Sequence, residues 1–233
     1  MKRIFVPTRA GNDWQWLLAK PKLHWRTGKS AMTAAASWEH ASNDFPPEIS
    51  GLLDSSLDED LIGLKLLAAM PEWEVPLPGG KTTSHTDVLA LASNKRGLCV
   101  MAVKAKVDEN FGPLLQEKRA GTSPGQHCRL RYLHSVLGIA PLDDSIRYQL
   151  LHRTASAIIT AREFHAHVAV MVVQSFGTQP SLREDFDTFS RSLSAEDMPG
   201  GMKVIPSIRT PRLFLGWCTG DHEFLKVVLP SVV

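Results

Sequence analysis

One acid and two lysines lie on either side of a short polar turn, and these residues are the best placed in the sequence to do chemistry. Asp87 opens one apolar run, and Lys104 and Lys106 lie near the end of the next. Residues 93–97 (SNKRG), between the runs, are typical of a hairpin turn. Side chains two apart on a strand share a face, so an antiparallel pair would bring the carboxylate and the ammonium groups together. Such charges are seldom found inside an apolar sheet unless they are paired or functional.

A second set of polar residues lies on one side of a predicted helix over residues 144–164, with Asp144 as a candidate cap. Gln149, His152 and Arg153 fall on this side, opposite the apolar residues of the helix. A polar helix face beside a charged sheet is suited to contact a substrate, but it is equally typical of a solvated surface.

The remaining elements follow from hydrophobic periodicity and turn residues. Short helices are expected at 12–20 and 30–41, where four tryptophans (Trp14, Trp16, Trp25, Trp38) suggest a helical cap that docks on a larger body. We predict helices at 57–70, 126–137 and 182–194, strands at 72–77, 85–92, 98–107, 167–173 and 212–218, and a loop at 108–127. This order predicts an α/β fold, with a mixed sheet flanked by helices. We expect one domain: an N-terminal helical extension (1–50), a core (57–175) and a C-terminal helix and strand (176–233).

The order helix, three strands, helix, strand, with Asp87 in the second strand and Lys106 late in the third, resembles the PD-(D/E)xK nuclease superfamily. The resemblance covers about residues 57–175 and implies a restriction-endonuclease-like αβββαβ core acting on nucleic acid. It implies Mg²⁺ held by Asp87, with Lys106 as the catalytic lysine and Gln149, joined by His152 and Arg153, facing the scissile phosphate. The segments GGKTTSHTDVL, KVDENFGP and RYQLLHRTASA are also similar to an uncharacterised bacterial family, which implies no activity.

The sequence departs from the superfamily pattern at Lys104, which stands where the superfamily has Asp or Glu. A second ammonium beside Asp87 opposes cation binding, by several kcal/mol at an effective dielectric constant of about 20. Three hypotheses stay open: a Mg²⁺-dependent nuclease, an inactive nuclease-like domain in which Lys104 helps to bind nucleic acid or a protein partner, and an interaction protein whose charges are a structural ion pair. A replacement carboxylate could come from any of four nearby acids: Glu72, Glu74, Asp108 or Glu109.

Composition limits the broad class of protein. The chain has 43% apolar and 21% charged residues and a net charge of +2, as in ordinary globular proteins. No run approaches the ~18 apolar residues of a membrane span, so we expect no membrane partner. Cys99, Cys128 and Cys218 are widely spaced, which predicts neither disulfides nor a zinc site and favours a cytoplasmic location. The sequence lacks the GxGxxG, P-loop, GxSxG and HExxH motifs.

Charge is unevenly distributed along the chain. Residues 39–60 carry seven acids and no Lys or Arg, whereas basic residues are dense between Lys95 and Arg131. A basic face attracts phosphates, but it can equally pair with the acidic segment or be solvated.

Overall fold

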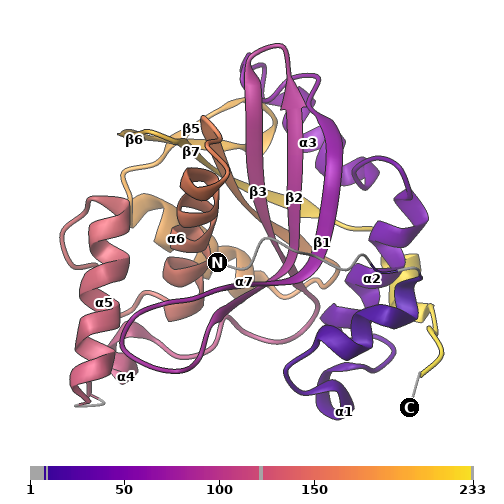
Figure 1. Ribbon diagram of the computed structural model, residues 1–233, viewed down its shortest axis with the longest axis horizontal. Helices are drawn as coiled ribbons and strands as arrows, with labels where there is room; N and C mark the ends of the chain where they lie inside the picture. The colour runs from indigo at the N-terminus through magenta and orange to yellow at the C-terminus, as the bar shows by residue number, and fades with distance from the viewer. Residues whose placement is uncertain (1–7, 9, 121–122, 232–233) are drawn as a thin grey trace.

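The fold is built on a seven-stranded mixed sheet with strand order β1-β2-β3-β4-β7-β6-β5 (Figure 1). The computed structural model describes residues 8, 10–120 and 123–231. The strands are β1 (Lys65–Val75), β2 (Ser84–Asn94), β3 (Gly97–Lys106), β4 (Val168–Ser175), β5 (Glu196–Asp197), β6 (Lys203–Arg209) and β7 (Arg212–Thr219). The predicted α/β class with a mixed sheet is confirmed.

The sheet changes from antiparallel to parallel pairing at β3. Strands β1, β2 and β3 form an antiparallel meander, whereas β4 is parallel to both β3 and β7. A parallel neighbour requires a crossover, and the chain makes it through helices between β3 and β4. Every residue of β4 is buried, as its continuous apolar sequence predicts for a central parallel strand.

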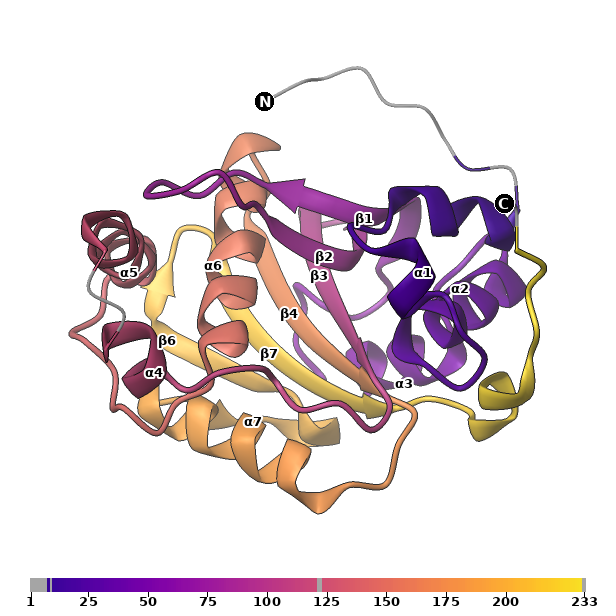
Figure 2. The ribbon, with the colours of Figure 1, turned by 90° about the horizontal axis from the view of Figure 1, so that it is seen from below.

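Helices cover both faces of the sheet (Figure 2). One face carries α4 (Leu115–Ala120), α5 (Pro124–Leu137), α6 (Tyr148–Glu163) and α7 (Pro180–Ser192). The other carries α1 (Pro21–His24), α2 (Ser30–Ala41) and α3 (Pro47–Ser55), with the 3-10 turns η1 (Gly11–Leu17), η2 (Pro199–Gly201) and η3 (His222–Lys226) near them. Each face holds its own apolar core. None of the described helices has the length and apolar character needed to cross a membrane.

Local sequence explains the helix that carries part of the site. The Ser123 hydroxyl accepts a hydrogen bond from the Gln126 amide at 3.2 Å, and Pro124 occupies the first turn of α5. Gly138 ends the helix in the left-handed region with φ 65°. These signals place α5 within two residues of the predicted 126–137.

A buried polar network joins the N-terminal helices to the central strand β4. The Trp38 indole donates to Gln174 Oε1 at 3.1 Å, and Gln174 Nε2 donates to Glu48 Oε1 at 2.6 Å and to Ser37 Oγ at 3.2 Å. The predicted docking of aromatic side chains is therefore seen at Trp38, whereas Trp16 is 59% exposed.

The predicted helix at 57–70 is wrong, because residues 59–63 form turns and β1 begins at Lys65. Leucines spaced for one helix face instead divide between core and solvent: Leu61 is fully buried and Leu57 is 71% exposed. Leu57 and Gly63 adopt positive φ, which interrupts a helix. The helix before the meander is α3, which the sequence analysis missed.

Other helix and strand boundaries also differ from those predicted from the sequence. Helix α6 begins at Tyr148 and not at Asp144, because the Leu115 and Tyr148 amides donate to the carbonyls of Ile146 and Pro113 and hold this segment extended. The predicted loop 108–127 contains α4, and β5 and β6 extend the sheet beyond the predicted strands. The strands 85–92, 98–107, 167–173 and 212–218 correspond to β2, β3, β4 and β7. The parts of the predicted segments at 1–7, 9, 121–122 and 232–233 lie outside the described residues.

The network at β4 can be tested by replacing Gln174 with Ala. The variant leaves the buried Trp38 N–H and the Glu48 carboxylate without their partner, so we expect a loss of about 2–3 kcal/mol in the free energy of unfolding. Urea denaturation measures this loss. The exposed Gln116→Ala is the matched control, with an expected change within about 0.5 kcal/mol. Equal losses for the two variants would contradict the assignment.

Candidate functional site

An ion pair between β2 and β3 lies at the centre of the candidate site. Val88 pairs with Val103 across the two strands, which places Asp87 directly opposite Lys104. Lys104 Nζ lies 2.7 Å from each carboxylate oxygen of Asp87, and the Ala105 amide donates to Oδ2 at 2.7 Å. The side chains of Asp87 and Lys104 are only 10% and 12% exposed. The predicted juxtaposition of acid and ammonium is therefore present, while the catalytic roles stay predictions.

Lys106 lies two residues further along β3 and is buried. Its ammonium donates to the Asn110 carbonyl at 2.7 Å and lies 4.6 Å from the centre of the Phe111 ring. Burial, together with the charge of Lys104, lowers the pKa of Lys106 to about 7. Near neutral pH this amine therefore exchanges a proton with little cost, a property typical of functional sites.

Glu72 on β1 brings a second carboxylate to the same place. It lies between the pairs Pro71–Val88 and Trp73–Thr86, and so opposite Asp87. Burial raises the pKa of Glu72 to about 8, and the neighbouring charge of Asp87 acts in the same direction. The Glu72 backbone has φ 49°, a conformation that costs a non-glycine residue about 1–3 kcal/mol and is often found at functional sites.

Helix α6 packs its polar side chains against the start of β2. Ser84 Oγ accepts from Arg153 Nη1 at 3.0 Å and from Ser156 Oγ at 2.8 Å, and it lies 2.8 Å from His152 Nδ1. Arg153 is 8% exposed, and the charges of Asp87 and Glu72 interact with it. The interpretation of Gln149, His152 and Arg153 as a solvated helix face is therefore wrong for Arg153, which is buried against the sheet, whereas Gln149 and His152 are half-buried. Glu72, Asp87, Lys104, Lys106 and Arg153 are called the charge cluster below.

Gln149 stands apart from these contacts. It lies in the first turn of α6, and its Oε1 atom is buried without a hydrogen-bond partner in the described part of the chain. The structure thus brings together five of the six predicted site residues, Asp87, Lys104, Lys106, His152 and Arg153, through hydrogen bonds and charge interactions.

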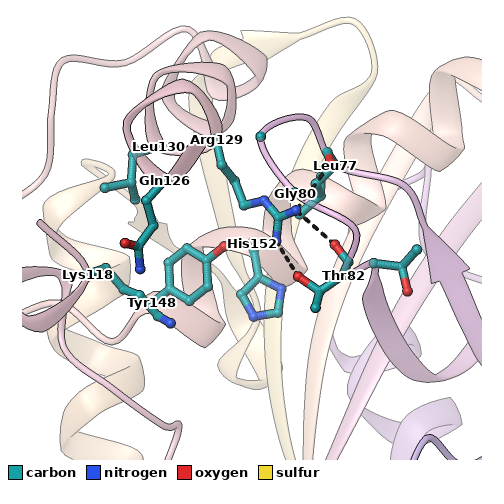
Figure 3. A pocket seen from close by; sticks show the side chains of 11 residues that line it. Leu77, Gly80, Thr82, Lys118, Gln126, Arg129, Leu130, Tyr148 and His152 are labelled. Atoms are coloured by element: carbon teal, nitrogen blue, oxygen red, sulfur yellow. Dashed lines mark hydrogen bonds between the residues drawn. The ribbon is translucent and has the colours of Figure 1, made fainter. Parts of the chain in front are cut away.

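A pocket of about 260 Å³ opens beside the charge cluster (Figure 3). It lies between α5, the start of α6, α4 and the loop that joins β1 to β2. We call it the basic pocket, and its lining residues are Leu77, Gly79, Gly80, Thr82, Thr83, Lys118, Gln126, Arg129, Leu130, Tyr148 and His152. Lys118 and Arg129 bring positive charge, and none of these residues is acidic.

Arg129 of α5 holds the β1–β2 loop in place. Its guanidinium donates to Thr82 Oγ1 and the Thr82 carbonyl at 2.9 Å each (Figure 3). It also donates to the Pro78 carbonyl at 3.0 Å and to the Leu77 carbonyl at 3.3 Å. All four acceptors are neutral, so they orient the guanidinium without cancelling its charge. A Cβ atom on Gly79 would lie 1.9 Å from the Gly125 carbonyl oxygen, so this close contact requires glycine.

His152 connects the basic pocket with the charge cluster. It lines the pocket, and its Nδ1 atom contacts Ser84, which also binds Arg153. Burial, with the charges of Arg153 and Lys104, holds the pKa of His152 well below its usual range. The imidazole is therefore neutral at pH 7, and the positive charge of the pocket comes from Lys118 and Arg129.

The residues around Asp87 do not fit Mg²⁺ as they are arranged. Magnesium prefers carboxylate and water oxygens in an octahedral shell. Both oxygens of Asp87 accept hydrogen bonds from Lys104, and Glu72 is mostly protonated at pH 7 because its pKa is about 8. Over residues 8, 10–120 and 123–231, no three His, Cys, Asp or Glu side chains are grouped to hold a metal. Cys99, Cys128 and Cys218 are free thiols.

Comparison with protein families identifies the chain over most of its length. Residues 7–222 match the model of a family described as a domain of unknown function (DUF6946). The chain belongs to this family. Comparisons with curated proteins and with solved structures give no match. The family description states no activity, so the function of this DUF6946 chain has to be argued from its geometry.

Apart from His152, the residues that line the basic pocket of this DUF6946 domain were not among the predicted site residues. Lys118 and Arg129 lie in the stretch between Lys95 and Arg131, whose basic density was the available signal. Ser84 and Tyr148 carried no signal of their own, since their roles depend on how α6 packs on β2. Glu72 was one of four acids considered as replacements, and it is the one placed opposite Asp87.

The pKa of Glu72 predicts an unusual pH dependence of stability. The unfolded chain ionises Glu72 above about pH 4.5 while the folded chain keeps it protonated up to about pH 8. Stability is therefore lost as pH rises through this window, by up to about 1.4 kcal/mol per pH unit. We expect Glu72→Gln to remove this loss, so that it becomes more stable than the wild type by a few kcal/mol as pH rises to about 8.

Urea denaturation of both proteins between about pH 5 and about pH 8 measures the difference. The exposed Glu184→Gln on α7 is the matched control and should follow the wild type across the range. A Glu72→Gln variant whose stability stays parallel to that of the wild type would show that Glu72 ionises normally in the fold.

Proposed function

We propose that this DUF6946 protein is a catalytically inactive, nuclease-like domain that binds nucleic acid through the basic pocket. The observation that carries the proposal is the pairing of Lys118 and Arg129 in one pocket whose lining residues include no carboxylate. Phosphate groups are among the anions that Arg and Lys bind well, through charge-assisted hydrogen bonds. The uncompensated cations of the pocket therefore favour a ligand that carries phosphate.

The net charge of the charge cluster beside the pocket also favours the binding of an anion. Lys104 neutralises Asp87, Glu72 is mostly uncharged at pH 7, and Arg153 adds a full positive charge. Lys106 adds about half a charge, since its pKa is about 7. The cluster is thus net positive, and attraction between opposite charges acts over about 10 Å at moderate salt.

The resemblance to the PD-(D/E)xK superfamily supports nucleic acid as the source of the phosphate. The elements α3, β1-β2-β3, α6 and β4 occur in the order of the αβββαβ pattern, with α4 and α5 inserted before α6 and with α3 in place of the helix expected at 57–70. Asp87 and Lys106 keep their expected positions on the second and third strands. Lys104 distinguishes this chain from the pattern and supports binding without hydrolysis.

Metal-dependent cleavage is the second candidate function. Glu72 favours it, because this residue adds a second carboxylate opposite Asp87, and Lys106 has a pKa close to neutral. The Lys104 ammonium weighs against it, since a metal would have to displace that group from both Asp87 oxygens.

Oligonucleotide binding tests the proposal directly. We expect fluorescently labelled single-stranded DNA or RNA to bind at about 50 mM salt and to be released as salt approaches about 200 mM, because binding of phosphates displaces counterions. The variant Lys118→Gln should weaken binding roughly tenfold at the lower salt and reduce the slope of log K against log salt by about 1. Fluorescence anisotropy measures both quantities.

Lys95→Gln is the matched control, because Lys95 lies in the β2–β3 turn at the opposite end of the strand from Ser84. It should bind as the wild type does. Absence of binding at low salt, or an equal loss in both variants, would remove the support for a nucleic-acid site in this pocket. Products cleaved in the presence of Mg²⁺ and lost in Asp87→Asn would instead favour the second candidate.

A further inference from the structure

We infer that the basic pocket binds the terminal phosphate monoester of a nucleic acid strand and not an internal phosphodiester. The inference rests on the proposed function and names the part of the ligand that enters the pocket. Three features carry it: the charge of the pocket, its size and the way its walls are fixed.

Charge is the first feature. A phosphate monoester carries about −1.5 to −2 charges at pH 7, whereas a phosphodiester carries one. The pocket presents the two cations Lys118 and Arg129 together, which matches the monoester. Lys118 forms no ion pair with any described residue, and its ammonium lies 5.2 Å from the centre of the Tyr148 ring. This lysine is therefore free to pair with a ligand.

Size is the second feature. A volume of about 260 Å³ is below the usual range for drug-sized ligands, roughly 300–1,000 Å³, and suits one phosphate with part of its nucleotide. The pocket is enclosed on three sides, by the β1–β2 loop, by α5, and by Lys118 of α4 with Tyr148 of α6 (Figure 3). The end of a strand can bring one phosphate into such a space, whereas an internal phosphodiester would have to bring in the chain on both of its sides.

The third feature is that the pocket is formed before the ligand arrives. Four hydrogen bonds from Arg129 hold the loop 77–82, and the close contact of Gly79 with Gly125 fixes the same loop against α5. The Tyr148 and His152 rings lie 4.8 Å apart between their centres and brace the opposite side. Groups held in advance lose little entropy on binding, which favours selection of one phosphate form.

The experiment compares one short single-stranded oligonucleotide in three forms: with a 5′-phosphate, with a 3′-phosphate and with hydroxyl groups at both ends. At fixed ionic strength we expect one phosphorylated form to bind about tenfold more tightly than the hydroxyl form, since it gains a close charge pair. The preference should shrink below about pH 6, where the monoester dianion takes up a proton and carries a single negative charge, as a phosphodiester does. Nucleoside monophosphates should compete, and nucleosides should not.

Variants locate the effect in the pocket. Lys118→Gln should remove the preference for the phosphorylated end, Lys118→Arg should keep most of it because it keeps the charge, and Lys95→Gln should leave it unchanged. Circular dichroism melting of each variant checks that the fold is retained.

The outcomes separate this inference from the proposed function. Equal binding of all three oligonucleotides would overturn the inference and leave nucleic-acid binding standing. If inorganic phosphate competes as strongly as nucleoside monophosphates do, the pocket recognises phosphate alone. That result would overturn the inference that the pocket also contacts the nucleotide. Binding of nucleoside monophosphates without any binding of oligonucleotides would uphold the monoester site and overturn the proposed nucleic-acid function.

Discussion

The ion pair between Asp87 and Lys104 is the interaction on which the rest of the site depends. Strand pairing places the two residues directly opposite each other, and the sheet and α6 bury them almost completely. Removing one partner of a buried pair typically costs about 3–5 kcal/mol, because the other charge is left without compensation. The pair also limits the chemistry: both oxygens of the Asp87 carboxylate are engaged by the Lys104 ammonium, so this carboxylate is not open to a cation.

The surrounding charges follow from this pair. Lys106 and Arg153 would be more costly to bury beside an unpaired Lys104 ammonium, whose charge already lowers the pKa of Lys106. Ser84 then links the cluster to the basic pocket through His152. The buried charge cluster and the basic pocket proposed to bind the ligand are therefore connected through hydrogen-bonded side chains.

Local signals in the sequence predicted the parts of the structure that depend on local contacts. Strand alternation and a polar turn were sufficient to bring Asp87 to Lys104, and capping residues were sufficient for α5. The segment 57–70 was predicted wrongly because contacts distant in sequence decide its structure: Asp58 binds Arg212, a partner 154 residues away. The basic pocket was missed for the same reason, since Arg129 binds the loop 77–82 about fifty residues before it. Propensity is a weak guide wherever such tertiary contacts compete with it.

The central claim is that Lys104, which holds both oxygens of Asp87, stands where the PD-(D/E)xK pattern that the sequence resembles has a metal-binding carboxylate. Calorimetric titration of Mg²⁺ into the wild-type protein tests it most directly. We expect no saturable heat at millimolar Mg²⁺ from the wild type, and a gain of binding in Lys104→Asp, which supplies the missing carboxylate beside Asp87. Saturable Mg²⁺ binding by the wild type that disappears in Asp87→Asn would contradict the account.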